Sequence, residues 1–288
     1  MICEHPEQHP AASVRQMCQL LSVSRPWLYE KPVASEGHAE NTSLRDAIEC
    51  ICLAFPGYGC RCVTAQLHRD GWGVNHKWVL AVMQTESLLC RLQKAFRPPS
   101  ASSTKTAYPN LTQQLVVERL DQVWVVDMTY VRLPQDFVYP ACVLDSFSRR
   151  VIGWHLSCEI DTRLTLAALN CAITARRPCS DLIHHSDRGV QYASADYVAR
   201  LAEIGACPST SRAGCPYENA KAESFFKTLR KEEVYLSQSQ NFEEARNSLG
   251  AFLDDVYNVK RLHSSLGYLP PMEFEASYAR QPTCTSKS

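Results

Sequence analysis

The sequence lacks the features that mark membrane-spanning, secreted or strongly basic proteins. It contains no run of about 18 apolar residues, so no transmembrane helix is expected. Its first residues have no basic segment followed by an apolar one, so we expect no secretory signal. The 288 residues include 30 Lys and Arg against 30 Asp and Glu, and this balance excludes a histone-like polycation. It leaves open a local basic stripe that binds nucleic acid.

A cysteine framework is also missing, although the chain has 14 cysteines. None of them forms a CxxC motif, and the spacings are irregular. Without a signal peptide, a disulfide scaffold is not expected in a chain of this size. We expect most of the cysteines to be small buried side chains in a reducing cytoplasm. His5 and His9 have a ligand-like spacing, but no cysteine pair follows to complete a zinc site.

Residues 1–42 predict a short helical segment followed by a polar linker. Apolar side chains recur at helical spacing within residues 11–32. Residues 33–42, VASEGHAENT, are mostly polar and predict the linker.

Residues 43–95 predict a helix-turn-helix region. A Pro-Gly pair ends the first helix, and a Gly-Trp-Gly turn separates two later ones. Asn75 is a suitable N-cap for the last helix, whose first turn carries His76 and Lys77, where a recognition helix reaches DNA. Arg61, His76 and Lys77 are therefore the candidate DNA contacts. A small helical bundle with solvated charges explains the same pattern.

Residues 96–119 predict an exposed linker, because their first part is rich in Pro, Ser and Thr. Basic residues in and around this segment could follow a phosphate backbone. More often, such a run is simply solvated.

Residues 120–275 predict an α/β domain, and residues 276–288 a disordered tail. Three segments rich in β-branched and aromatic residues predict an antiparallel meander: VWVVDMTYV, FVYPACVL and VIGWHLSC. Pro140, in the second segment, suggests an edge position or a bulge. A helix is predicted over residues 162–176, then the short strand LIHHS and further helices. This order indicates a mixed sheet with helices on its faces.

Three carboxylates stand out against this background. Asp127 lies in an apolar run, Asp187 ends a short apolar stretch, and Glu223 lies on a predicted helix. Each has an ordinary explanation when taken alone: a satisfied buried Asp, a turn Asp and a solvated helix Glu. Together, carboxylates from three elements can hold a pair of Mg²⁺ ions, which would stabilise the attacking and leaving oxygens of a phosphoryl displacement.

Several motifs, in order, resemble a known family. HHSDRGVQY, STSRAGCPYENAKAESFFKTLRKEEVY and YNVKRLHSSLGYLPPMEF are similar to the OrfB transposase of the insertion-sequence-3 family. YGCRCVTAQLHRDGWGVNHKWVLAVM resembles that family's upstream helix-turn-helix region. The family belongs to the DDE transposase and retroviral integrase superfamily, so the resemblance, over residues 44–275, implies a ribonuclease H-like fold.

The resemblance implies roles for particular residues. Asp127, Asp187 and Glu223 match the acidic triad, and Arg230 matches the basic residue of the family's signature. Lys227, one turn after Glu223, is expected to hold a phosphate in the same way as Arg230. Asn219 and His185 are expected to orient a carboxylate, the backbone or DNA. Four further matched residues are expected to be structural first and DNA contacts second: Tyr257, Asn258, Arg261 and His263.

The resemblance further implies cleavage and joining of DNA by an enzyme with two Mg²⁺ ions, with Mn²⁺ as an expected substitute. The expected partners are double-stranded DNA at the element ends and target, further copies of the chain, and an OrfA product or OrfA–OrfB fusion. No membrane partner is expected, and the expected location is the bacterial cytoplasm, on the nucleoid when DNA is bound. Two alternatives stay open: a non-catalytic DNA-binding regulator or domesticated remnant, and a ribonuclease H-type nuclease.

Overall fold

The structure, a computed structural model, describes residues 37–90, 108–212, 219–234 and 239–280. The chain falls into two compact units, Met1–Ala47 and Ile48–Ser288. None of the described helices is both long enough and apolar enough to cross a membrane.

The first described helix corrects the predicted linker. Helix α3 spans Gly37–Ala54, so it includes the last six residues of the segment 33–42. The linker prediction was wrong because a mostly polar segment can form a solvated helix as readily as a linker. The helical segment predicted over residues 11–32 lies outside the described residues.

Helices α4 (Cys60–Arg69) and α5 (His76–Thr85) form the predicted helix-turn-helix pair. The chain turns at Gly71, whose φ of +91° favours glycine. Asn75 caps α5 as expected, because its side chain accepts a hydrogen bond of 2.9 Å from the backbone N–H of Lys77. The pair buries one apolar side of each helix, made of these residues: Val63, Leu67, Val79, Val82 and Met83.

In the described part of the chain, six strands form one mixed sheet in the order β2-β3-β1-β5-β6, with β4 paired to β3. Their bounds are β1 (Val123–Met128), β2 (Val131–Arg132), β3 (Phe137–Asp145), β4 (Val151–Ser157), β5 (Ile183–Ser186) and β6 (Cys207–Thr210). The pairs β1–β3 and β3–β4 are antiparallel, whereas β1–β5 and β5–β6 are parallel. This topology confirms the predicted meander and the ribonuclease H-like mixed sheet.

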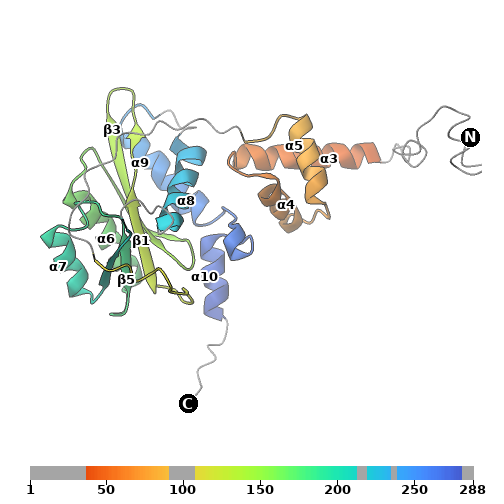
Figure 1. Ribbon diagram of the computed structural model, residues 1–288. Helices are drawn as coiled ribbons and strands as arrows, with labels where there is room; N and C mark the ends of the chain where they lie inside the picture. Colours follow the sequence, from red (N-terminus) through yellow and green to blue (C-terminus); the bar gives the residue numbers. More distant parts are fainter. Residues whose placement is uncertain (1–36, 91–107, 213–218, 235–238, 281–288) are drawn as a thin grey trace, which may run out of the picture. The chain divides into compact units, whose positions relative to one another are not determined.

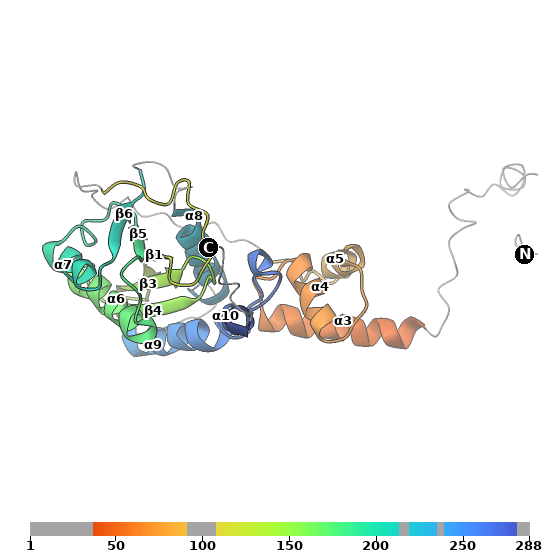
Figure 2. The ribbon, with the colours of Figure 1, turned by 90° about the horizontal axis from the view of Figure 1, so that it is seen from below.

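Helices cover both faces of the sheet (Figures 1 and 2). They are α6 (Thr162–Arg176), α7 (Ala195–Glu203), α8 (Ala220–Leu229), α9 (Phe242–Ala251) and α10 (Pro271–Arg280). Two π-helical segments, η2 (Arg230–Val234) and η3 (Phe252–Tyr257), extend α8 and α9, and a 3-10 turn, η4, spans Ser264–Leu266. Side chains of α8 and α9 pack on one face, and those of α6 and α7 on the other.

Strand β1 serves both cores because its side chains alternate between the faces. Val123 and Val125 pack with α8, whereas Trp124 and Val126 pack with α6 and α7. All four are buried, and each such side chain contributes about 1.5–3 kcal/mol of burial free energy. Asp127 continues the alternation, so it projects on the α8 side.

Pro140 corrects another expectation, because it lies neither on an edge strand nor at a bulge. It pairs with Leu156 inside β3, and the irregularity of that strand lies at Val143/Leu144. Its carbonyl accepts from Thr129, and in an antiparallel strand the N and C=O of one residue point the same way. The N–H that Pro140 lacks would therefore have pointed toward the end of β1, where the hydrogen bonds between β1 and β3 end.

The cysteine expectation is wrong for the described residues. Of the ten cysteines described there, all free, Cys142 alone is buried. Cys171 lies at helical spacing from the buried Leu164 and Ala168 of α6, but it is exposed. The buried arc of α6 runs through Thr165, Ala168, Leu169 and Ala172, and Cys171 lies beyond its edge. The predicted tail is also corrected, since residues 276–280 belong to α10.

Candidate active site

Asp127 and Asp187 lie at the carboxyl ends of two neighbouring parallel strands. In that pair, Val125 of β1 stands opposite His185 of β5. Each aspartate follows its strand residue by two positions, so both side chains project on the same face. Adjacent strands lie about 4.8 Å apart. The parallel register therefore brings the two carboxylates together, although 59 residues separate them in the sequence (128–186).

The pKa of Asp127 is raised by burial and by the neighbouring carboxylates. Burial and the charge of Asp187 raise the pKa of Asp127 to about 8, with Glu223 adding to the rise. The backbone N–H of Met128, which donates to Asp127 Oδ1 at 2.8 Å, and the charge of Arg230 oppose it. Repulsion among carboxylates of this kind is relieved when a cation binds between them.

Asp187 is held by the tight turn that follows it. The backbone N–H of Gly189 donates to Asp187 Oδ1 at 2.8 Å. A Cβ at Gly189 would lie 3.0 Å from that oxygen and 3.3 Å from the ring of Tyr192. The glycine therefore lets the backbone pass between the carboxylate and the aromatic ring.

Tyr192 was not predicted from the sequence to belong to the site. Its hydroxyl is buried without a hydrogen-bond partner among the described residues. Burial and the charges of Asp127 and Asp187 raise its pKa well above the usual tyrosine value. An unsatisfied buried hydroxyl is costly, and the charges of Asp127 and Asp187 act on this one, so Tyr192 joins the candidate site residues.

Glu223 reaches the site from helix α8. The apolar side of this helix, which packs against β1, consists of Ala222, Phe225, Phe226 and Leu229. Glu223 is exposed beside that side, and its charge reaches Asp127. Sequence spacing predicted the helix, and packing of its aromatic residues on the sheet sets its distance from the strand ends.

The two predicted basic residues follow Glu223 along the same element. Lys227 is exposed one turn later. Arg230 is half-buried at the start of η2, where its Nε donates to the carbonyl of Phe226 at 3.2 Å. Its charge lowers the pKa of Asp127, so it lies close enough to act on the carboxylates.

The three carboxylates interact electrostatically but do not form a complete metal-binding site in the described residues. Within the described ranges, no three His, Cys, Asp or Glu side chains stand close enough together to hold one metal ion. Asp127 and Asp187 are positioned by strand register, whereas Glu223 lies on helix α8.

The other predicted site residues take different positions. His185 is fully buried, and its Nδ1 lies 2.9 Å from Ser209 Oγ, which ties β5 to β6. Asn219 is buried just before α8, and its Oδ1 has no partner in the described part of the chain. The three candidate DNA contacts of the helix-turn-helix region are exposed on α4 and α5: Arg61, His76 and Lys77.

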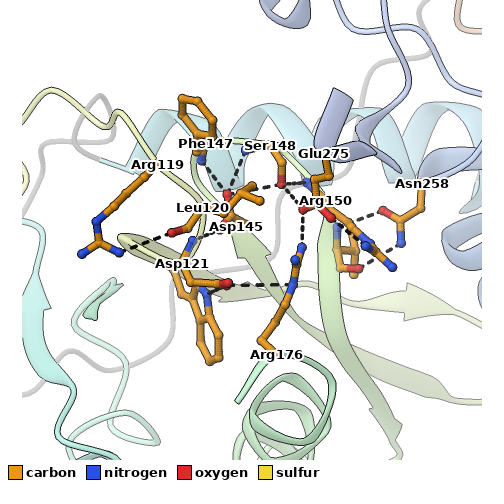
Figure 3. A network of polar contacts seen from close by, with 12 residues as sticks. Arg119, Leu120, Asp121, Asp145, Phe147, Ser148, Arg150, Arg176, Asn258 and Glu275 are labelled. Atoms are coloured by element: carbon orange, nitrogen blue, oxygen red, sulfur yellow. Dashed lines mark hydrogen bonds and ion pairs between the residues drawn. The ribbon is translucent and has the colours of Figure 1, made fainter. Parts of the chain in front are cut away.

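A buried polar network that the sequence did not reveal holds the opposite end of the sheet (Figure 3). Asp145, fully buried at the end of β3, accepts backbone hydrogen bonds from Asp121 at 2.6 Å and from Phe147 and Ser148 at 2.8 Å. It pairs with Trp124 near the start of β1, far from Asp127. Its role is structural.

Glu275 extends this network and attaches α10 to the sheet (Figure 3). The carboxylate is buried and accepts hydrogen bonds from Ser148 Oγ at 2.7 Å and from Arg150 at 2.6 Å. It also pairs with Arg176 of α6. Its pairing with two arginines from distant elements explains why no local pattern marked it.

The fold and these carboxylates define a class of protein. An antiparallel meander is followed by two parallel strands, and acidic residues lie at the carboxyl ends of β1 and β5. Family models agree, because an integrase core domain model matches residues 118–216, a second one matches residues 205–271, and an HTH-like domain model matches residues 39–96. The chain therefore combines an integrase core with an HTH-like domain.

Relatives identify the family. The transposase InsF for insertion sequence IS3A of Escherichia coli is 32% identical over 277 residues, which cover 93% of this chain and 96% of the relative. The transposase for IS629 of Shigella sonnei is 38% identical over 222 residues, covering 77% and 74%. The chain belongs to the IS3 family of insertion-sequence transposases. It is a DNA transposase, an enzyme of the transposase and integrase class.

Two of the solved structures with a similar course of the chain are retroviral. A simian T-cell lymphotropic virus intasome in complex with the PP2A regulatory subunit B56 gamma matches with a TM-score of 0.46 and 15% identity, covering 84% of this chain and 78% of that one. The HTLV-2 integrase catalytic core domain in complex with magnesium matches at 0.41 and 15%, covering 54% and 95%.

Proposed function

We propose that this transposase cleaves and joins DNA with Asp127, Asp187 and Glu223 as its catalytic carboxylates. The observation that carries the proposal is the register of β1 and β5, which sets two aspartates side by side at the strand ends. The raised pKa of Asp127 agrees with it, because burial and then the charges of Asp187 and Glu223 cause the rise.

The donor set fits hard divalent cations. Carboxylate oxygens are the ligands that Mg²⁺ prefers, and Mn²⁺ accepts the same set. Asp127, Asp187 and Glu223 would hold the ions. Two such ions would neutralise the charge that develops on the attacking and leaving oxygens.

The protein's own groups prepare this arrangement. The backbone N–H groups of Met128 and Gly189 each fix one carboxylate oxygen, so both aspartates are oriented before a cation arrives. Lys227 and Arg230 follow Glu223 on the same element and would bind non-bridging phosphate oxygens of the DNA. His185, because it is buried, would position β5 and not touch DNA.

Two displacements at phosphorus would follow from this site. In the first, water attacks a phosphodiester at the element end, and the bond to the leaving 3′ oxygen breaks, giving a 3′-OH. In the second, that 3′-OH attacks a phosphodiester of the target, one P–O bond forms and another breaks. No covalent intermediate with the protein is needed.

The domains divide this work in the proposal. Residues 43–95 would bind DNA through Arg61, His76 and Lys77, residues 96–119 would link, and residues 120–275 would carry the chemistry. We further propose that several copies assemble on the DNA ends, and that an OrfA product or an OrfA–OrfB fusion supplies specificity for the ends.

A joining assay tests the proposal. Labelled element ends are incubated with target DNA and Mg²⁺, using the wild type and Asp187→Asn. We expect joined product from the wild type and none from the variant. Equal product from both proteins would refute the carboxylate assignment. Cleavage of RNA–DNA hybrids without joining would favour the ribonuclease H-type alternative.

A further inference from the structure

A second polar cleft lies beside α8, away from the strand ends that carry the aspartates. It encloses about 400 Å³ and is lined by residues of α8, of the β3–β4 turn and of the chain around η4. Its polar lining includes Arg149, Lys221, Ser224, Thr228, His263 and Ser264. Within the described part of the chain, no Asp or Glu lines it. We call it the Arg149–Lys221 cleft.

Arg149 occupies a backbone position that would suit glycine. Its φ is +63°, in the left-handed region, at the turn where its N–H donates to the carbonyl of Asp145 at 2.9 Å. Turns of this kind normally place Gly or Asn there, because a Cβ is disfavoured at positive φ. An arginine at this position suggests that the side chain is retained for what it binds.

Among the residues that the structure describes, the half-buried guanidinium group of Arg149 makes no hydrogen bond and no ion pair. Burial lowers its pKa. A desolvated cation without a partner is unfavourable, so the cleft is built for an anion that is not part of the described chain.

Lys221 brings a second positive charge to the cleft. Its Nζ donates to the carbonyl of Ser146 at 3.2 Å and to that residue's hydroxyl, both neutral acceptors. Arg149 and Lys221 both line the cleft, so two positive charges share it.

The nearby carboxylates are already engaged elsewhere. Asp145 accepts three backbone N–H groups and is fully buried behind the turn. Both carboxylate oxygens of Glu232 accept hydrogen bonds from Arg261, at 2.7 and 2.8 Å. Arg261 is another cation that lines the cleft. The charge of Arg261 is thus paired, whereas those of Arg149 and Lys221 leave the cleft net positive.

We propose that the Arg149–Lys221 cleft binds a phosphate of the DNA backbone that is not the reacting one. Arg149 supplies a planar donor fork, Lys221 a point charge, and the hydroxyls of Ser224 and Ser264 neutral donors, which together suit a phosphate group. The inference rests on the proposed function, which brings DNA to α8. A free phosphate has the same chemistry and is an outcome of the test.

The cleft is separated from the carboxylates. Lys221 and Glu223 are two residues apart, so they project about 200° apart around α8. Ser146, the partner of Lys221, bonds to Val123 at the start of β1. Asp127 lies four residues further along that strand, or about 13 Å at 3.3 Å per residue. The phosphate held here therefore belongs to a more distant part of the DNA.

Arg149→Gly tests the inference sharply, because glycine suits the backbone while removing the cation. DNA affinity of the full chain is measured by fluorescence anisotropy over a range of salt concentrations. We expect affinity to fall about five- to tenfold and the slope of log K against log salt to drop by about one. The melting temperature should stay the same or rise. An unchanged affinity and slope would overturn the inference, as would a lower melting temperature with normal binding.

Matched variants separate the sources of the effect. Arg163→Gln removes an exposed arginine that pairs with Glu159 and Asp161, and it should leave affinity and slope unchanged. Inorganic phosphate is titrated into the wild type and Arg149→Gly with the melting temperature as readout. If phosphate stabilises only the wild type while both proteins bind DNA equally, the cleft serves free phosphate and the DNA assignment is overturned.

Asp187→Asn keeps this test apart from that of the proposed function. This variant should lose joining while it retains the full salt slope. If it joins DNA as the wild type does but Arg149→Gly still loses affinity and slope, the catalytic assignment fails and the cleft stands. If the wild type binds no DNA at low salt, the cleft assignment is overturned with it.

Discussion

Asp127 and Asp187 occupy equivalent positions on neighbouring parallel strands. Each is the second residue after Val125 or His185, the last residue pair that β1 and β5 form with each other. A shift of the register by one residue would turn one carboxylate to the opposite face of the sheet. The pairing of these two strands, which apolar residues on both faces fix, therefore controls whether the site exists.

The turn after Asp187 gives a first prediction. Gly189→Ala places a methyl group 3.0 Å from Asp187 Oδ1 and 2.9 Å from Gln191 Oε1. Because these are movable side-chain atoms, we expect less than about 1 kcal/mol loss of stability. The displaced carboxylate should slow joining by about tenfold or more. Gly73→Ala, which meets no atom within 4 Å, is the control. A normal joining rate for Gly189→Ala contradicts the role assigned to the turn.

Tyr192→Phe removes a buried hydroxyl that has no partner among the described residues. Because nothing is left unsatisfied, the free energy of unfolding should stay the same or rise by up to about 1 kcal/mol. Joining should slow by about tenfold, because the hydroxyl lies where the charges of Asp127 and Asp187 act on it. Thermal unfolding and a joining assay on the same preparation check this. A less stable variant with normal joining would show that the hydroxyl is structural.

Gly153 tests the packing of α6 on the sheet. A Cβ there would lie 2.5 Å from the carbonyl oxygen of Ala168 and 2.5 Å from the backbone N of Ala172. Backbone atoms cannot move aside as side chains do, so we expect Gly153→Ala to cost about 2–3 kcal/mol or more. Chemical denaturation measures the difference. A loss below about 1 kcal/mol would mean that α6 does not approach β4 this closely.

Glu275 gives a prediction with a pH signature. Burial alone would raise the pKa of Glu275, but hydrogen bonds from Arg176, Ser148 and Arg150 hold it below its usual value. A depressed folded-state pKa stabilises the protein above the usual glutamate pKa, and this contribution is lost as pH falls through the folded-state value. We expect Glu275→Gln to cost about 3 kcal/mol at pH 7 and much less at pH 3.

The matched control for this prediction is Glu273→Gln, because Glu273 is an exposed carboxylate on the same helix. Exposed charges contribute at most about 1 kcal/mol, so little change is expected at either pH. Unfolding is followed by circular dichroism at both pH values. A Glu275→Gln effect that does not shrink in acid would argue against the ionised network.

Much of this fold was predictable from local sequence. The apolar runs predicted β1, β3 and β4, and apolar periodicity predicted the helix observed at Thr162–Arg176. The three carboxylates were predicted from their order and the family resemblance, and β1–β5 pairing gives two of them a common location. Local patterns succeed here because one apolar face determines each element.

The remaining features depend on long-range contacts. Strand β6, CPST, is short, has little apolar character and is defined by its parallel pairing with β5. The position of Glu275 depends on Arg176, 99 residues away in the chain. Arg149 looked like part of a polar turn, and only its φ and its place in the cleft distinguish it. No local propensity contains this information.

The joining rates of single and double carboxylate variants test the central claim most directly. Rates are measured in Mg²⁺ for Asp127→Asn, Asp187→Asn, Glu223→Gln and the double variant of both aspartates, with Glu203→Gln as an exposed control. Residues that act as one unit are strongly non-additive. We predict that each single variant loses about a thousandfold or more and that the double variant loses no more. Losses that multiply, or a single variant that joins DNA at the wild-type rate, would contradict the account.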